Sequence, residues 1–128
     1  MELDVLKFGP RVTALPIIHG SGECALEVRR LLLEGGFDCL AVPLPASFQA
    51  DVEQAIAHLP RPTVVIQREG PRYVTEWQPD AEPSSDEPRT ASYVPIDPCQ
   101  GVVAALRFAL EERLPRKFID LETARFRP

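Results

Sequence analysis

The sequence predicts a single α/β domain, a three-layer sandwich around a mostly parallel sheet with an antiparallel hairpin at one edge. Two observations carry this prediction. Segments with the apolar patterns of strands alternate along the chain with segments that have helical periodicity. A chain of 128 residues also has the length of one domain, residues 1–128. Alternation of this kind indicates parallel strands that are joined by right-handed crossovers.

The first predicted unit is a strand, a tight turn and a helix. Residues 12–18 form an apolar run, and Pro16 within it predicts a strand end, a bulge or an edge position. Ser21 is placed to cap a helix in which apolar residues recur at helical spacing from Cys24 onwards. The glycine pair that begins at Gly35 predicts the end of this helix.

The second unit is a strand followed by another helix. Residues 38–44 are continuously apolar after the aspartate, as expected of a parallel strand that is covered on both faces. We therefore expect this strand at the centre of the sheet. Ser47 is predicted to cap a helix over residues 48–59 that carries one apolar stripe.

The middle of the chain predicts a hairpin and a loop. Residues 63–67 are predicted to form a strand, and residues 73–77 to pair back on it as an irregular hairpin. Residues 78–90 are acidic and rich in proline, with no aliphatic residue larger than alanine. This composition predicts an exposed, mobile loop inside the single domain.

The last unit is a strand, a helix and a final strand. Residues 92–97 are predicted as the strand, and Asp97, Pro98 and Gln100 match the N-cap, N1 and N3 positions of a capped helix. Residues 117–121 are predicted to form the last strand.

Charge and cysteine usage limit the classes of function. The net charge of −5 argues against nucleic-acid binding, because a polyanion is held by clustered Lys and Arg. The N-terminus shows no secretory leader and no run has the length of a membrane span, so we expect a cytoplasmic protein without a membrane partner. Cys24, Cys39 and Cys99 are odd in number and lack CxxC spacing, which favours reduced thiols in the core.

A candidate site lies where the predicted parallel strands end. Their carboxyl ends are expected to bring His19, Asp97 and Asp120 to one edge of the sheet, where open α/β folds bind ligands. His19 can act as a metal ligand or general base, and equally as a turn histidine that is hydrogen-bonded to backbone. Glu23, in the first helical turn, can share a cation with His19 or simply complement the helix dipole.

The two aspartates of this site differ in whether a structural role explains them. Asp97 is already explained as an N-cap. Asp120 near the end of an apolar strand needs a partner or water, and Arg116 or Lys117 can supply the partner. The sequence thus offers His19 and Asp120 as candidates for catalytic roles, and His19, Glu23 and Asp97 as candidate ligands of a divalent metal ion.

Cys99 is a weaker candidate. It lies in the first turn of a predicted helix, where the dipole favours a thiolate nucleophile, but a small buried thiol is the simpler interpretation.

Three segments resemble a known superfamily. Pro16-Ile-Ile-His-Gly-Ser-Gly22, with the helix and strand that run from Val28 to Val42, resembles the opening unit of the TraB and erythromycin-esterase-like superfamily. Residues 93–97, 104–110 and 116–121 are similar to a later segment of uncharacterised bacterial members. The resemblance implies an α/β fold in which His19 belongs to a metal or hydrolytic site.

This chain departs from the superfamily pattern in two respects. Members typically carry a glutamate at the end of the second strand, where this chain reads Val42-Pro43-Leu44-Pro45. Members are also usually longer, so the chain resembles an N-terminal portion or a reduced member.

Two functions follow as expectations. The first is a hydrolase-like domain that performs metal-assisted hydrolysis of a small-molecule or peptide substrate. The alternative is a non-catalytic module that binds a small ligand or associates with another domain or with a second copy. The missing glutamate and the short chain favour the alternative.

Overall fold

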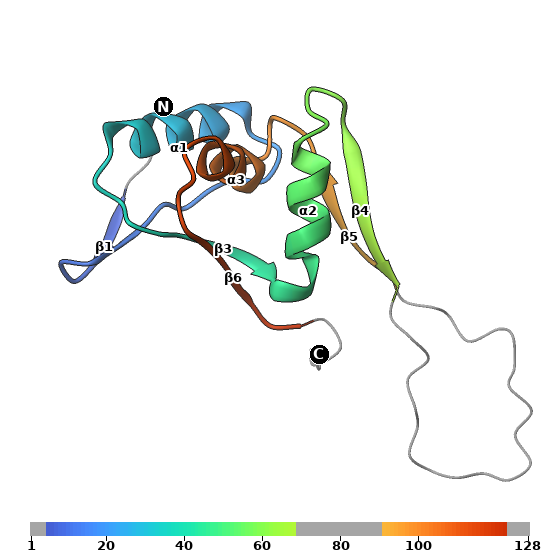
Figure 1. The fold of residues 1–128 in the computed structure, drawn as a ribbon. Coiled ribbons are helices and arrows are strands. Elements are labelled where there is room, and N and C mark those ends of the chain that lie inside the picture. The colour runs from blue at the N-terminus through green and yellow to red at the C-terminus, as the bar shows by residue number, and fades with distance from the viewer. Residues whose placement is uncertain (1–4, 69–90, 123–128) are drawn as a thin grey trace, which may run out of the picture.

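The computed structural model describes residues 5–68 and 91–122, so the predicted strand at 73–77 and the loop at 78–90 lie outside the described residues. Figure 1 shows the arrangement of the elements. They follow in the order β1 (Leu6–Phe8), β2 (Val12–Ala14), α1 (Gly22–Glu34), β3 (Leu40–Pro45), a 3-10 turn (Ala46–Phe48), α2 (Gln49–Ile56), β4 (Thr63–Arg68), β5 (Ala91–Ile96), α3 (Gly101–Glu111) and β6 (Arg116–Asp120).

The described strands pair two by two. β1 and β2 are antiparallel, β3 and β6 are parallel, and β4 and β5 are antiparallel. The domain is therefore a small mixed α/β fold, as predicted. A three-layer sandwich is not confirmed, because none of the sheets that the structure describes is wider than two strands.

Prolines explain why β3 is not the centre of a wide sheet. Pro43 and Pro45 have no backbone N–H, so a strand that carries them cannot donate along its whole length. The register with β6 shifts at the same place, between Val42 opposite Phe118 and Pro45 opposite Asp120. β3 and β6 are parallel to one another, as predicted, but β3 does not lie at the centre of a wider sheet among the described strands.

Two other strands pair differently from the prediction. β2 ends before Pro16 and pairs with β1, which the sequence did not indicate. β5 was expected to be parallel to the first strand, but it is antiparallel to β4, with Thr63 opposite Ile96 and Arg68 opposite Ala91.

The predicted cap of α1 is confirmed. The Oγ of Ser21 accepts a hydrogen bond from the backbone N–H of Cys24 at 3.3 Å. Gly35 has a φ of 85°, a conformation that glycine adopts without steric cost, and it ends the helix. Cys24, Ala25 and Val28 are the buried residues of α1.

The other two predicted caps are wrong. Ser47 lies in the 3-10 turn, and its backbone N–H and hydroxyl donate to the carboxylate of Glu122 at 2.9 and 2.5 Å. α3 begins at Gly101, and the Oδ1 of Asp97 accepts from the backbone N–H of Cys99 at 2.7 Å. Asp97 thus stabilises the turn that precedes the helix and not the helix itself.

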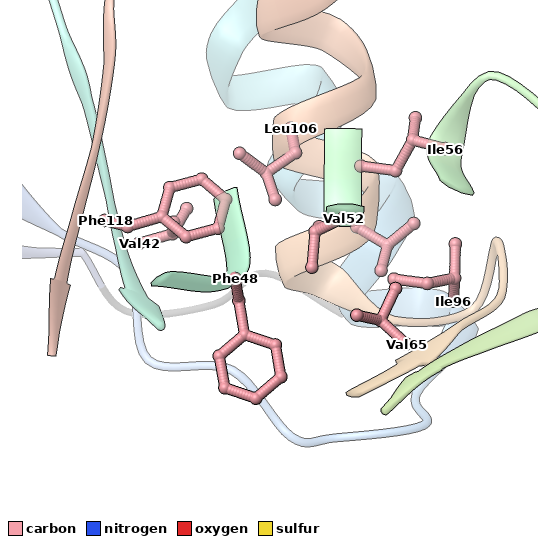
Figure 2. Close-up of a cluster of buried hydrophobic side chains, with 9 residues drawn as sticks. Val42, Phe48, Val52, Ile56, Val65, Ile96, Leu106 and Phe118 are labelled. Atoms are coloured by element: carbon pink, nitrogen blue, oxygen red, sulfur yellow. The ribbon is translucent and has the colours of Figure 1, made fainter. Parts of the chain in front are cut away.

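The hydrophobic core lies between the β3–β6 and β4–β5 sheets. Figure 2 shows Val42 and Phe118 on one side, Val65 and Ile96 on the other, and side chains of α2 and α3 between them. The cluster consists of Val42, Phe48, Val52, Ile56, Val65, Ile96, Val103, Leu106 and Phe118. α1 lies outside this cluster and packs along α3 (Figure 1).

Within residues 5–68 and 91–122, the helices are too short or too polar to cross a membrane.

Candidate functional site

Two turns meet at the N-terminal ends of α1 and α3. The backbone N–H of Gly20 donates to the Oε1 of Gln100 at 3.0 Å. Gly20 has a φ of 74°, which glycine tolerates, and the turn closes with the N–H of Ser21 bonded to Ile18 O at 3.2 Å. The structure therefore brings the predicted His19 turn beside the turn that contains Asp97.

The two helices run in the same direction from these turns. A Cβ built on Gly22, the first residue of α1, lies 3.8 Å from the Sγ of Cys99 just before α3. Further along, Arg29 of α1 lies 3.9 Å from the carboxylate of Glu111 at the end of α3. Because the starts are adjacent and later residues also meet, α1 and α3 are parallel neighbours.

A pocket of about 280 Å³ lies between these helices. α1, α3, the turn before α3 and the residues after α2 all contribute to its wall. Its lining residues are Gly22, Ala25, Leu26, Arg29, Leu59, Pro98, Cys99, Val103, Ala104 and Arg107.

The pocket is apolar except for its two arginines and one thiol. Small residues such as Ala25 and Ala104 keep the facing helix surfaces open, and Leu26 and Leu59 add larger apolar surface. The guanidinium groups of Arg29 and Arg107 both face the carboxylate of Glu111, at 3.9 and 3.5 Å. The carboxylate of Glu111 therefore interacts with both arginines of the pocket.

Three of the predicted site residues lie at or near the two turns. His19 and Glu23 are exposed, Asp97 is half-buried, and none of them lines the pocket. In the described part of the chain, no group of three or more His, Cys, Asp or Glu side chains can hold a metal ion. His19, Glu23 and Asp97 thus share a region without forming the predicted three-ligand set.

Asp120 lies elsewhere, in the β3–β6 sheet. It is exposed at the end of β6, opposite Pro45, and its Oδ1 accepts from the N–H of Leu121 at 2.8 Å. Figure 1 shows the ends of β3 and β6 close to the start of α2, away from the starts of α1 and α3. The expected meeting of His19 and Asp120 at one sheet edge is therefore not seen.

The expected partner of Asp120 is engaged by another carboxylate. Arg116 donates from Nε and Nη2 to the carboxylate of Glu53, which also accepts from Gln49 at 3.3 Å. The hydrogen bond from Arg116 lowers the pKa of Glu53 below its ordinary value. This pair connects α2 to the start of β6 and has a structural role.

The cysteines are free, as predicted, but only one of them is in the core. Cys24 is buried, whereas Cys39 and Cys99 are exposed. The expectation of a buried thiol is thus wrong for Cys99, which lines the pocket. The pocket residues include no His, Asp or Glu that could act as a base for this thiol.

Sequence reasoning missed Arg29 and Arg107. One available signal was the run Gly22, Ala25, Leu26 and Arg29, which shares one face of α1 at i, i+3, i+4 and i+7. Small residues on such a face permit a gap against a neighbour. The identity of that neighbour, α3, is a matter of tertiary packing.

Comparison of the chain with family models, curated proteins and solved structures gives no match.

Proposed function

We propose that this domain is a non-catalytic binding module that takes a small ligand in the pocket between α1 and α3. The observation that carries the proposal is the pocket itself, with about 280 Å³ of space and mainly apolar walls. Pockets for drug-sized ligands typically measure about 300–1,000 Å³, so this one suits a smaller molecule.

The chemistry of the lining supports binding over catalysis. Acid–base catalysis needs a group that titrates in a useful range within hydrogen-bond reach of the substrate. The lining has two arginines and one thiol, and it includes no His, Asp or Glu. Such a lining can hold and orient a molecule, and it lacks the imidazole or carboxylate that acid–base catalysis most often uses.

The test uses Cys99 as a built-in reporter of occupancy. Small fragments that are neutral, cationic or anionic are added to the protein, and alkylation of Cys99 by iodoacetamide is followed by mass spectrometry. Cys39 is also exposed but does not line the pocket, so it is the internal reference. We expect at least one fragment to slow the labelling of Cys99 and not that of Cys39.

Two variants in which phenylalanine replaces an alanine control for non-specific effects. Ala104→Phe places a phenyl ring in the pocket and is expected to abolish fragment binding in calorimetry. Ala50→Phe adds the same ring at an exposed position of α2 outside the pocket and should leave binding unchanged. If no fragment protects Cys99, or if both variants bind as well as wild type, the proposal is wrong.

Metal-assisted hydrolysis is the second candidate. The hydrogen bond from Gly20 to Gln100, which brings the His19 turn beside the Asp97 turn, supports it. The proposed resemblance of the sequence to the TraB and erythromycin-esterase-like superfamily implies the same chemistry. Calorimetry with Zn²⁺ and Mn²⁺ tests it: binding at one site that disappears in a folded His19→Ala variant supports the candidate. Absence of binding to wild type contradicts it.

We also propose a cytoplasmic location and an association with another domain or with a second copy of the chain. Three free cysteines are consistent with the reducing cytoplasm that the sequence predicts. Association with another domain or a second copy is supported by the outer face of β4–β5, where Val64, Ile66 and Tyr93 are 54%, 61% and 68% exposed. Light scattering that gives the mass of one chain at all concentrations would contradict self-association.

A further inference from the structure

We infer that the ligand of this pocket is a small organic monoanion, a carboxylate carried on an apolar body, that binds to Arg29 and Arg107. The inference rests on the proposed binding function, because it names the class of molecule that the pocket takes.

The first argument is the local charge. Arg29 and Arg107 come from different helices and both line the pocket, whereas Glu111 is the carboxylate that lies near both of them. Among the described residues, these two cations and one anion leave a net charge of +1 at this end of the pocket. This local excess is opposite in sign to the net charge of −5 of the whole chain.

The second argument is the geometry of the ion pairs. The distances from Glu111 to Arg29 and Arg107 are 3.9 and 3.5 Å. Charge-assisted hydrogen bonds between such groups are typically about 2.7–2.9 Å long. Each guanidinium carries five N–H donors in a planar fork that matches a carboxylate, so the loose contacts to Glu111 leave donors for a second carboxylate.

The third argument is the place of the arginines along the helices. Arg29 follows Gly22 by seven positions and Arg107 follows Gly101 by six, which corresponds to about 10 Å in each helix. Because the helices are parallel and start together, both arginines belong to the same end of the pocket. Cys99 lies at the other end, and apolar wall lies between. The ligand therefore has its acid at the arginines and its apolar body directed toward Cys99.

The surroundings favour a carboxylate over a phosphate ester. Glu111 remains beside the arginines and would repel a dianion more strongly than a monoanion. A single negative charge matches the local excess.

The experiment compares four probes with the same apolar body. Phenylbutyrate, phenylbutanamide, phenylbutylamine and phenylbutyl phosphate are titrated by calorimetry, and protection of Cys99 from alkylation confirms the location of each. We expect phenylbutyrate to bind and to protect Cys99, with the amide and the amine at least about tenfold weaker because each lacks the charge that the arginines bind.

Charge variants test the arginines directly. Arg29→Gln and Arg107→Gln are each expected to weaken phenylbutyrate binding by about tenfold, because one charge-assisted interaction is lost. Arg30→Gln is the matched control, because Arg30 pairs with Glu27 and Glu34 and does not line the pocket. Since Arg29 and Arg107 are about half exposed, their replacement should leave the fold intact, which circular dichroism verifies.

A leucine pair tests the apolar body. Leu26 and Leu33 are both exposed on α1, at 71% and 61%, but only Leu26 lines the pocket. Leu26→Ala should weaken phenylbutyrate binding, whereas Leu33→Ala should not.

The outcomes separate the two proposals. If the amide or the amine binds as tightly as the carboxylate, or if the arginine variants bind phenylbutyrate normally, the anion class is wrong and the binding module stands. If the phosphate ester binds more tightly than the carboxylate, the choice of a monoanion is overturned. If no probe of any charge protects Cys99, the proposed binding function fails as well.

Discussion

Ser21 accounts for the start of α1 through one hydrogen bond. Its Oγ accepts from Cys24 N–H, which satisfies one of the free donors at the helix start. We expect Ser21→Ala to lower the free energy of unfolding by about 1 kcal/mol, measured by urea denaturation. Ser21→Asn keeps a side-chain acceptor and should stay close to wild type. Equal stability of the alanine variant and wild type would show that the cap contributes nothing.

The Glu53–Arg116 pair should make the folded protein less stable in acid. Arg116 lowers the pKa of Glu53 from its ordinary value of 4.5, so the folded state binds the proton less readily than the unfolded state. The stabilisation is present above this value and is lost as the pH falls through the lowered pKa. The side chains are only 24% and 20% exposed, so we expect a contribution of order 1 kcal/mol.

Glu53→Gln tests this pH dependence. Wild type should lose more free energy of unfolding than the variant when the pH is lowered from about 6 to about 3. Glu34→Gln is the control, because Glu34 pairs with Arg30 at a more exposed place, where its side chain is 61% exposed. It should retain the acid sensitivity of wild type. If Glu53→Gln also retains it, another group is responsible.

The two serines that were predicted as caps show what local sequence can determine. Both precede an apolar helical pattern, and only Ser21 caps. Ser47 bonds instead to Glu122, 75 residues away in the chain. Ser47 lies near Glu122 because β3 pairs with β6, and no local sequence pattern indicates that pairing.

At the scale of elements, α3 ends in a left-handed turn without glycine. Arg113 has a φ of 55°, and the N–H of Leu114 donates to Ala109 O at 2.8 Å, the pattern of a Schellman motif. A side chain at this position costs energy that glycine avoids. We expect Arg113→Gly to raise the free energy of unfolding by about 0.5–1 kcal/mol, observed as a higher Tm.

Arg113→Ala is the control for this change. It also removes the guanidinium but keeps a Cβ in the left-handed conformation, so it should give no gain. A gain of the same size in both variants would assign the effect to charge and not to backbone conformation.

β3 illustrates a conflict between two sequence signals. Its continuous apolar run predicts a central strand, whereas Pro43 and Pro45 remove donors that a central strand needs. In the structure β6 is the described strand that pairs with β3, as expected when prolines remove the donors that a second neighbour would need.

For the whole molecule, stability depends on residues that join both sheets. Leu106 of α3 is fully buried in the cluster that connects the β3–β6 and β4–β5 sheets (Figure 2). We expect Leu106→Ala to lower the free energy of unfolding by about 3 kcal/mol, through lost burial and a cavity. Leu26→Ala, at a position that is 71% exposed, should change it by less than about 0.5 kcal/mol.

Urea denaturation followed by circular dichroism and by the NMR signals of backbone amides in β3–β6 and in β4–β5 makes this measurement. Coincident transitions in wild type would show that the two sheets unfold together around this core. A small effect of Leu106→Ala would mean that the core relaxes around the missing side chain.

The sequence by itself determined the helices, the identity of most strands and the cap of α1. These features follow from periodicity, proline and glycine positions and local hydrogen bonds, which act over a few residues. It also predicted that the His19 turn and the Asp97 segment belong to one candidate site. The structure brings these two segments together through the hydrogen bond from Gly20 to Gln100. Tertiary structure alone decided the pairing of the strands, the separation of Asp120 from His19, and the pocket. That pocket exists because α1 packs parallel to α3, and contacts between distant segments of this kind are not encoded in any local pattern.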